Sequence, residues 1–431
     1  MIKILQKPVY IKFAQDIDFF KLFQKIEQQF STCFIFESLG EEGKFSRYSI
    51  IGFDPEYVIS ARESRFLDLR KIMPQNIISG NYAGGLVGYL SYEAINYFEP
   101  SLNVKVHDLF EQFMFGVYTD GLILDKLTNE LFYFYYDTDR SGILKNIMKS
   151  KLNKSGVQVK FVKDSLTKEE HGKIVEKVRE QIKLGNIFQC EVGFKSEYQI
   201  TGDALNLYER LRKINPSPFM YYLKFSDKKI IGASPELLFS LRDGEITSRP
   251  LAGTIQRGKN ETEDRQLART LLNDPKERAE HNMLVDLHRN DIGKIAKFGT
   301  IKVRDLMSVK KFSHVQHISS EITGVIKKGE DMFSALEANF PAGTLTGTPK
   351  IEAMKIIDRE EIEARGPYGG AVGHFGFNGD STFAIAIRSL FISGSYAFTQ
   401  NSGGIVYDSK PDKEYDEIQR KLAAMRKVLA V

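Results

Sequence analysis

Two acidic pairs at helical spacing are the residues of this sequence that could do metal chemistry. Glu277 and Glu280 lie three residues apart in PKERAEHNMLVDLHR (275–289). Glu414 and Glu417 repeat that spacing near the C-terminus. Side chains three residues apart share one face of a helix, so each pair presents two carboxylates together. If two such helices meet, the four carboxylates repel one another unless a hard cation with oxygen ligands, such as Mg²⁺, lies among them.

Ordinary structural roles explain the same residues when each helix is taken alone. Asp274 is a suitable N-cap, Pro275 suits the first turn, and Glu277 lies at a capping-box position. In the last helix, predicted over about 411–430, Lys421 continues the polar line of the carboxylates beside an apolar stripe. A solvated amphipathic helix has the same pattern, so both interpretations stay open at the level of these residues.

Two glycine-bearing segments could approach an anion closely. The loop PAGTLTGTPK (341–350) can present backbone N–H and hydroxyl groups to an anion. Gly403 and Gly404 permit close backbone approach because they lack a side chain. A tight structural turn would have the same composition as the loop, so composition alone does not decide between the two interpretations.

Arg388 is a charge inside the apolar, strand-like run 383–392. A charge in such a run is costly to bury without a partner. On a half-exposed strand, Arg388 could pair with Asp380 or Glu363. Alternatively, its guanidinium could form a bidentate clamp on a carboxylate.

Helices and strands alternate irregularly along the chain and must position these residues. Helical patterns cover about 168–185, 275–289 and 411–430. The strand-like runs are 33–38, 47–53, 83–92, 131–137, 219–225, 229–234, 237–241, 371–377 and 383–392. Their hairpin-length connections favour α+β layers over alternating βαβ units. A Lys-rich stretch near 145–165 is expected to connect two halves of the chain.

Composition excludes several classes of protein. The 431 residues include 60 Lys and Arg against 56 Asp and Glu, and a net charge of +4 does not indicate a nucleic-acid binder. Cys33 and Cys190 are the only cysteines, which excludes a disulfide framework and a multi-Cys zinc site and fits a reducing cytoplasm. No run approaches the about 20 apolar residues that span a bilayer, and the N-terminus lacks the pattern of a signal peptide. We therefore expect a cytoplasmic protein without nucleic-acid or membrane partners.

Five motifs in order make the sequence resemble the chorismate-binding enzymes. They are ERAEHNMLVDLHRNDIGKI, PAGTLTGTPK, RGPYGGAVGHFGF, AIAIRS and GGIVYDSKPDKEYDE. The resemblance covers about 160–430, and FES, RYSIIGF and GGLVGYLSYE resemble the N-terminal part of the anthranilate synthase component I branch. It implies an α+β fold of two packed antiparallel β-sheets flanked by helices. It also implies an N-terminal region over 1–155 that contributes to a feedback site, and a catalytic region over 160–431.

The resemblance assigns a role to each candidate residue. Glu280 and Glu417 match the carboxylates that bind Mg²⁺, with Glu277 and Glu414 in the same cluster, and this metal holds the ring carboxylate of chorismate. Arg388 and Tyr368 match the groups that bind the enolpyruvyl carboxylate. The implied substrate-binding residues are Arg388, Tyr368, Gly403, Gly404, Lys421 and Thr254. The implied catalytic positions are His317, a possible general acid near the leaving C4 hydroxyl, together with Thr344, Gln189 and Ala252.

Two positions favour one reaction within the family. Ala252 stands where aminodeoxychorismate synthases of one type carry a nucleophilic lysine, and alanine has no nucleophile. Gln189 stands where isochorismate and salicylate synthases carry a lysine that activates water, and glutamine is not a competent base at neutral pH. Ammonia is the remaining nucleophile, which implies conversion of chorismate and ammonia to anthranilate and pyruvate in tryptophan biosynthesis. The alternatives are component I of an aminodeoxychorismate synthase and a non-catalytic paralogue that binds chorismate or tryptophan.

The resemblance also implies a feedback site and a partner. NPSPFM (215–220) resembles the site of tryptophan inhibition in anthranilate synthase. The expected inhibitor-binding residues are Glu37, Ser38, Asn215, Pro216, Ser217, Pro218, Phe219 and Met220. Neither cysteine has the sequence context of an amidotransferase nucleophile, so ammonia is expected from a separate glutamine amidotransferase subunit.

Some residues depart from the family pattern. Ser402 lies in NSGG (401–404), where the family usually has AGAG, and could alter the backbone contact to the ring carboxylate. Glu191 follows Cys190 where two valines are usual, and Thr348 replaces an alanine. The changes at Ser402 and Glu191 motivate the alternative of a paralogue that binds ligand without turnover.

Overall fold

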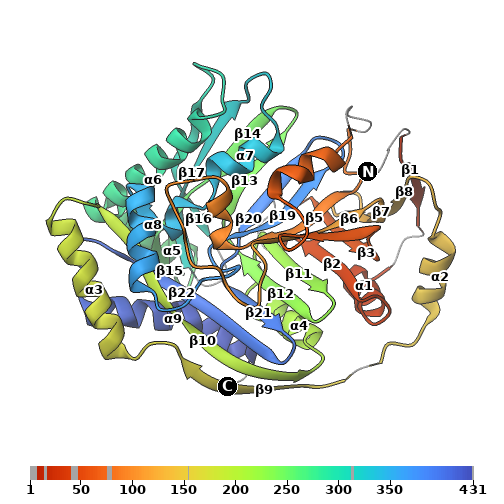
Figure 1. Ribbon diagram of the computed structural model, residues 1–431, viewed down its shortest axis with the longest axis horizontal. Helices are drawn as coiled ribbons and strands as arrows, with labels where there is room; N and C mark the ends of the chain where they lie inside the picture. The colour runs from red at the N-terminus through yellow and green to blue at the C-terminus, as the bar shows by residue number, and fades with distance from the viewer. Residues whose placement is uncertain are drawn as a thin grey trace.

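Two antiparallel β-sheets pack against each other in the computed structural model, with helices on their outer sides (Figure 1). The structure describes residues 7–13, 17–39, 47–74, 80–153, 155–311 and 315–429. Buried side chains from both sheets form one large hydrophobic core between them. This arrangement confirms the predicted α+β fold of two packed sheets.

The first sheet joins strands from both ends of the chain. Its strands, in spatial order, are β1 (Val9–Lys12), β8 (Glu130–Tyr135), β7 (Asp120–Asp125), β3 (Tyr48–Phe53), β2 (Thr32–Glu37), β11 (Phe219–Phe225), β12 (Lys228–Ser234), β21 (Ser389–Ser393), β22 (Tyr396–Ile405), β10 (Gln189–Gly202) and β18 (Gly347–Thr348), with β9 (Val157–Asp164) also paired to β10. Glu37 of β2 lies opposite Met220 of β11. Strands from the N-terminal and C-terminal parts of the chain therefore pair with each other in the middle of this sheet.

The second sheet is built in the same interleaved way. Its strands, in spatial order, are β15 (Leu251–Gln256), β17 (Val315–Val325), β14 (Glu245–Arg249), β13 (Leu237–Arg242), β20 (Ser381–Ile385), β19 (Ala371–Gly376), β5 (Gly85–Leu90), β6 (Phe113–Tyr118) and β4 (Tyr57–Ser60), with β16 (Lys302–Lys311) paired to β17. The boundary predicted near 155–160 coincides with the start of β9, at Val157. Strands from both sides of this boundary contribute to both sheets.

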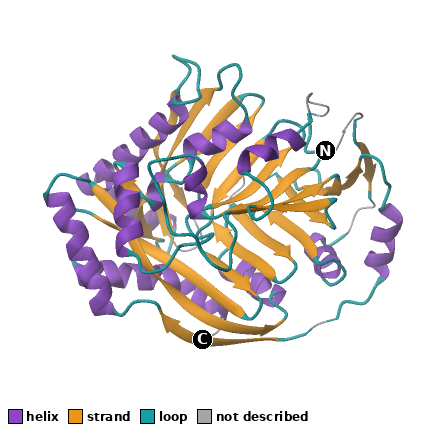
Figure 2. Cartoon of the chain, viewed as in Figure 1, coloured by secondary structure: helices purple, strands orange, loops and turns teal. Residues whose placement is uncertain are grey.

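Helices lie outside the two sheets (Figure 2). They are α1 (Phe19–Glu27), α2 (Ser141–Lys149), α3 (Lys168–Lys183), α4 (Leu205–Ile214), α5 (Glu261–Asn273), α6 (Pro275–Gly293), α7 (Met332–Asn339), α8 (Lys350–Glu360) and α9 (Pro411–Leu429), with the 3-10 segments η1 (Phe66–Ile72), η2 (Tyr92–Tyr97) and η3 (Gly343–Leu345). No helix in these described ranges is both long and apolar enough to cross a membrane.

The helices α3, α6 and α9 occur where the sequence patterns predict them. The Asp274 side chain caps α6 by accepting hydrogen bonds from the backbone N–H groups of Lys276 and Glu277, at 2.8 and 3.2 Å. On α9, the apolar stripe that includes Ile418 and Leu422 is buried. Caps and apolar stripes act over a few residues, so these helices are encoded locally.

The single strand expected over 383–392 is wrong, because the chain leaves one sheet and enters the other within this run. β20 ends at Ile385 in the second sheet, and β21 begins at Ser389 in the first. Between them Arg388 adopts a φ of 51°, in the left-handed region. Arg388 therefore lies at a crossover between the sheets.

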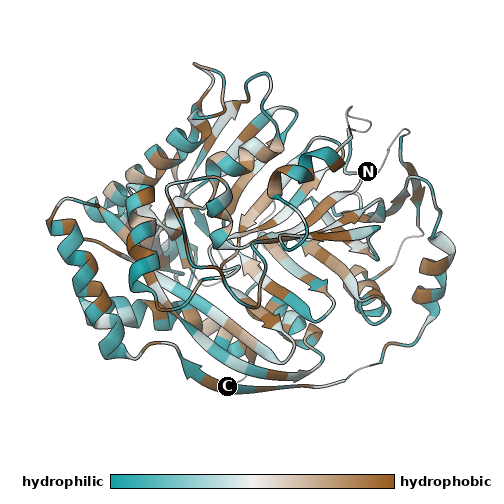
Figure 3. Ribbon diagram, in the orientation of Figure 1, coloured by the Kyte–Doolittle hydropathy of each residue, from teal (hydrophilic) through white to brown (hydrophobic). Residues whose placement is uncertain are grey.

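Aromatic rings fill much of the space between the sheets. Hydrophobic residues concentrate on the strands, whereas the outer helices carry many hydrophilic ones (Figure 3). Phe375 of β19 is fully buried, and its ring centroid lies 4.2 Å from that of Phe333 and 4.8 Å from that of Phe383. Such clustered aromatic rings contribute strongly to the stability of a core.

We expect Phe375→Ala to lower the free energy of unfolding by about 3 to 5 kcal/mol, because it leaves a cavity among packed rings. Chemical denaturation followed by circular dichroism measures this change. Leu127→Ala is the control, since Leu127 is 77% exposed and its loss should change stability by less than about 0.5 kcal/mol. Equal stability of the two variants would contradict the assignment of Phe375 to the core.

Candidate active site

Carboxylates of the two acidic helices, α6 and α9, influence one another's pKa. α6 packs on β15 and β17, and α9 packs on β22. Burial raises the pKa of Glu280 to about 7, and repulsion from Glu277, Glu191 and Glu417 adds to this shift. Burial also raises the pKa of Glu277, again with a contribution from Glu417. Carboxylates of α6 and α9 therefore act on one another, as the sequence analysis required.

The carboxylates of α9 differ because one of them has a cationic partner. Burial raises the pKa of Glu414, and Glu417 raises it further. Burial also disfavours ionised Glu417, but Lys421 lies 2.9 Å away and the net effect lowers the pKa of Glu417. Lys421 Nζ also donates to the backbone oxygen of Ser402 at 2.9 Å, which ties α9 to β22.

We call Glu277, Glu280, Glu414 and Glu417 the acidic cluster. The described part of the chain contains no group of three or more His, Cys, Asp or Glu side chains close enough to hold a metal ion. A cation in the acidic cluster would thus take few ligands from the protein and complete its shell with water or substrate oxygens, as Mg²⁺ commonly does. Burial, and to a lesser extent repulsion from neighbouring carboxylates, raises the pKa of Glu277, Glu280 and Glu414, and a bound cation would favour their ionised forms.

Arg388 supplies positive charge to the same region. Within the described residues its guanidinium forms no ion pair or hydrogen bond, and Glu363 instead pairs with Lys195 at 3.2 Å. Burial lowers the pKa of Arg388, while the nearby carboxylate of Glu236 opposes that shift. The guanidinium is thus available to bind an anionic ligand.

Glu236 connects Arg388 to the loop at 341–350. Thr344 Oγ1 donates a hydrogen bond to Glu236 Oε1 at 3.0 Å, and burial raises the pKa of Glu236 to about 7. Another threonine of the loop, Thr346, donates to the backbone oxygen of Ala342 at 3.2 Å. The loop therefore combines a structural turn with one hydroxyl, that of Thr344, directed toward the site.

His317 lies on β17 beside β15. Its Nδ1 is 2.8 Å from the backbone oxygen of Gly253 and 3.1 Å from Thr254 Oγ1. A carbonyl oxygen only accepts, so this hydrogen bond places the imidazole proton on Nδ1. Burial and the charges of Arg388 and Lys421 lower the pKa of His317 to about 4. His317 is thus neutral near pH 7 with its lone pair on Nε2, which suits an acceptor or base rather than the general acid expected from the sequence.

A chain of hydrogen bonds links three further residues. The hydroxyl of buried Tyr368 lies 2.9 Å from Ser402 Oγ, which donates to Glu191 Oε2 at 2.7 Å. Glu191 of β10 lies opposite Gly404 of β22. A Cβ on Gly404 would come within 2.6 Å of Gln189 Nε2 and 2.8 Å of Glu191 Oε1, so both side chains lie directly against its backbone.

Ala252 and Thr254 flank the backbone that contacts His317. Ala252 is buried on β15, and a Cβ on the next residue, Gly253, would lie 2.8 Å from Glu277 Oε2. This places β15 directly beside the acidic cluster. Gly403 lies on its other side, because a Cβ there would be 3.4 Å from Glu414 Oε2. The residues predicted for metal, substrate and catalysis thus converge on one site.

A family model described as "chorismate binding enzyme" matches residues 31–427. The chain belongs to the chorismate-binding enzyme family. It is 50% identical to "Anthranilate synthase component 1" of Leptospira biflexa, a match covering 99% of this chain and 97% of that protein. The protein of the same name from Methanothermobacter thermautotrophicus is 40% identical, over 95% of this chain and 91% of that protein. The crystal structure of anthranilate synthase component I from Streptococcus pneumoniae TIGR4 matches with a TM-score of 0.78 and 30% identity, covering 90% of this chain and 94% of that one.

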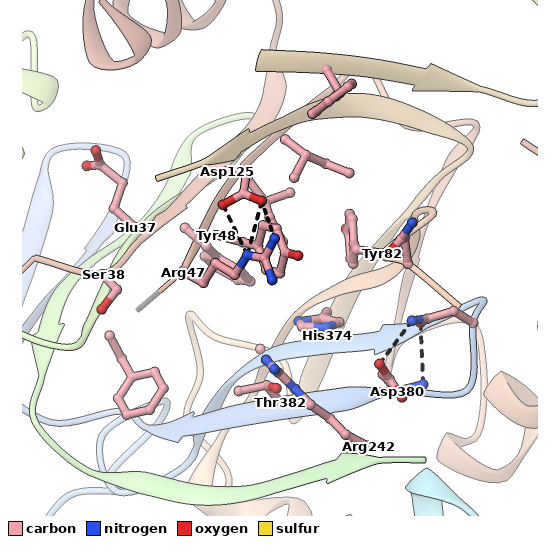
Figure 4. A pocket seen from close by; sticks show the side chains of 18 of the residues that line it. Glu37, Ser38, Arg47, Tyr48, Tyr82, Asp125, Arg242, His374, Asp380 and Thr382 are labelled. Atoms are coloured by element: carbon pink, nitrogen blue, oxygen red, sulfur yellow. Dashed lines mark hydrogen bonds and ion pairs between the residues drawn. The ribbon is translucent and has the colours of Figure 1, made fainter. Parts of the chain in front are cut away.

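This chorismate-binding family member also has a cavity of about 700 Å³ lined by residues of both sheets (Figure 4). Residues predicted for inhibitor binding line it: Glu37, Ser38, Pro218, Phe219 and Met220. Asn215, Pro216 and Ser217 do not line it, and the backbone oxygen of Ser217 instead accepts from Leu39 N at 2.9 Å. The residues of the candidate active site are not among its walls.

The polar side chains that line this cavity differ in whether they have hydrogen-bond or ion-pair partners. Two oxygens of the Glu37 carboxylate accept from Arg212 at 2.8 and 2.9 Å. Arg47 pairs with Asp125 at 2.6 Å on another wall (Figure 4). In contrast, Ser38 Oγ is buried and has no hydrogen-bond partner among the described residues. Ser38 therefore carries an unsatisfied hydroxyl in the wall of this cavity.

Sequence reasoning missed a buried arginine that organises the family site. Arg365 forms an ion pair with Glu361 at 2.7 Å and donates to the backbone oxygens of Leu345 at 2.6 Å and Glu191 at 2.8 Å. Its guanidinium also lies 5.7 Å from the ring centroid of Tyr368. Glu236 was missed as well. Its signal was a single charge beside an apolar strand, the same kind of signal that drew attention to Arg388.

We expect the imidazole of His317 to stay neutral from pH 8 down to pH 5, with its proton on Nδ1, because its pKa is lowered to about 4. Nitrogen NMR of ¹⁵N-histidine-labelled protein reports both properties. The signal of His317 is identified by its absence from the His317→Asn variant. A titration midpoint above pH 6 would contradict the burial of His317 beside Arg388 and Lys421. A proton on Nε2 of the neutral imidazole would contradict its contact with Gly253.

Proposed function

We propose that the chain is the synthase component of an anthranilate synthase. It would convert chorismate and ammonia to anthranilate, pyruvate and water. The observation that carries this proposal is the similarity over nearly the whole chain, at 50% identity, to a protein named Anthranilate synthase component 1. The convergence of the acidic cluster and Arg388 on one site supports it.

The two ends of the site suit the two carboxylates of chorismate. Mg²⁺, held by Glu280 and Glu417 with Glu277 and Glu414 beside them, would supply the positive charge that binds the ring carboxylate. Arg388, whose guanidinium has no partner within the described ranges, binds the enolpyruvyl carboxylate. Thr344 and the backbone at Gly403 and Gly404 complete the pocket for the two carboxylates. Gly403, Gly404 and Lys421 lie at its acidic end, on the side of the ring carboxylate.

The nucleophile that attacks C2 of chorismate is ammonia, because neither position that supplies another nucleophile in related enzymes does so here. Ala252 provides no nucleophile for covalent capture, and Gln189 provides no base to activate water. The nitrogen lone pair of ammonia forms a bond to C2, the ring double bonds shift, and the C4–O bond breaks with its electron pair leaving on oxygen. The nitrogen loses one proton and the departing hydroxyl gains one, so the oxygen leaves as water. His317 accepts a hydrogen bond at Nε2 and orients the leaving hydroxyl. Loss of the proton on C2 with cleavage of the C3–O bond then makes the ring aromatic, and the released enolpyruvate takes up a proton to become pyruvate.

Ammonia would come from a separate glutamine amidotransferase subunit. Hydrolysis of glutamine by such enzymes needs a reactive thiolate, and the two cysteines of this chain, Cys33 and Cys190, are both buried. Burial raises the pKa of each thiol well above its usual range. Neither cysteine can therefore serve as the amidotransferase nucleophile.

We expect the protein to form anthranilate when mixed with chorismate, ammonium chloride and Mg²⁺. Blue fluorescence of anthranilate measures the rate, and pyruvate should appear in equal amount. Removal of Mg²⁺ with EDTA should abolish the reaction, because the acidic cluster then repels the ring carboxylate. A non-aromatic amino product would instead indicate an aminodeoxychorismate synthase. Binding of chorismate without any turnover would indicate a non-catalytic paralogue.

We further propose that the cavity between the sheets binds tryptophan as a feedback inhibitor. Its walls combine aromatic and aliphatic side chains, which suit the ring of tryptophan, with many polar and charged side chains, which suit its ammonium and carboxylate groups. The rings of Tyr82 and His374 meet edge to face, with centroids 5.3 Å apart, and line the same space (Figure 4). The unpartnered hydroxyl of Ser38 supports a hydrogen bond to the ligand.

We expect tryptophan to inhibit anthranilate formation, and Ser38→Ala to raise the half-inhibiting concentration by about tenfold through loss of one hydrogen bond. The value of kcat without tryptophan should not change, because Ser38 is not in the active site. Ser49→Ala is the matched control, since Ser49 is buried on β3 but does not line the cavity. Initial rates that saturating tryptophan leaves unchanged would refute this site.

A further inference from the structure

Glu191 is a buried carboxylate that the mechanism above does not use. It lies on β10 two residues after Gln189, so both side chains point to the same face of the strand. Both also lie against Gly404, with Glu191 Oε1 2.8 Å and Gln189 Nε2 2.6 Å from the position of a Cβ. Glu191 is therefore part of the wall beside the expected site of the ring carboxylate.

One oxygen of Glu191 is held in place by a directed chain of hydrogen bonds. An ionised carboxylate only accepts, so the proton of the Ser402 hydroxyl points to Glu191 Oε2, 2.7 Å away. Ser402 Oγ then accepts the proton of Tyr368, whose hydroxyl lies 2.9 Å away. Oε2 is thus occupied, whereas Oε1 has no hydrogen bond within the described residues. The carboxylate presents a fixed, free acceptor.

The charges around Glu191 decide which ligand Oε1 can take. Burial raises the pKa of Glu191 and Glu417 adds to this, while Lys421 and Arg365 oppose it. An ionised carboxylate oxygen at this position accepts hydrogen bonds and cannot donate them. It attracts a small molecule with N–H groups, and ammonia is the reactant of that kind.

We infer that Glu191 Oε1 is the binding site for the incoming ammonia, with Ser402 as the residue that positions it. This inference rests on the proposed function. Anthranilate carries its amino group on the carbon next to the one that bears the carboxylate. Ammonia must therefore bind beside the ring carboxylate, next to Gly404. When Oε1 accepts an N–H of ammonia, the nitrogen lone pair remains free to point toward the ring.

The test varies ammonium chloride at saturating chorismate and Mg²⁺. We expect Glu191→Val to raise the KM for ammonium by about tenfold or more without raising the KM for chorismate. Glu191→Gln keeps one weaker acceptor and should show a smaller rise. Ser402→Ala frees Oε2 and should raise the KM for ammonium by about threefold. Thermal melting identifies the variants that fold. If Glu191→Val does not fold, the KM for ammonium of the nearly isosteric Glu191→Gln tests the inference instead.

Glu197→Gln is the matched control, because Glu197 lies on the same face of β10 but is 3.7 Å from Lys163 instead. It should leave both KM values unchanged. An unchanged KM for ammonium in folded Glu191 variants would overturn the inference. An equal rise in both KM values, or a loss of kcat alone, would also overturn it by indicating a structural role. Wild-type protein that makes no anthranilate would instead refute the proposed function.

Discussion

Repulsion between buried carboxylates is the constraint on which the active site depends. Burial disfavours the ionised form of Glu280, and neighbouring Glu277 and Glu191 add to this until its pKa reaches about 7. The fixed cations lie at the edge of the acidic cluster, where Lys421 pairs with Glu417. The middle of the cluster thus keeps uncompensated negative charge. That charge would become favourable if a divalent cation bound there together with a substrate carboxylate, as we propose.

Like charges stay close together only where the surrounding segments are held rigidly. The buried guanidinium of Arg365 fixes three of these segments to one another. It bonds Glu361 near the end of α8, the backbone of η3 at Leu345 and the backbone of β10 at Glu191. Each of these segments supplies or supports a residue of the site. A charge-assisted bond to a buried backbone oxygen is hard to replace, so small displacements of any one segment are resisted by the others.

The sequence allowed prediction of the features that are encoded locally. Helical spacing and the Asp274 cap predicted α6, and motif order predicted the two sheets. Contacts between residues far apart in the sequence could not be predicted from local patterns. The run around Arg388 has the pattern of one strand, because its crossing between sheets depends on partners elsewhere in the chain. Glu191 and Ser402 were visible only as departures from a pattern, since the hydrogen bond between them joins positions 211 residues apart.

Neither sheet can be completed while the ribosome is still making the first half of the chain. Leu90 of β5 lies opposite Ala371 of β19, and Glu37 of β2 lies opposite Met220 of β11. At a synthesis rate of about 5 to 20 residues per second, roughly 15 to 55 s pass between the synthesis of β5 and that of β19. During that interval one edge of β2 and one edge of β5 lack their partner strands, and open edges promote association between chains. These two edges are therefore the places where nascent chains are most open to pairing with one another until β11 and β19 are made.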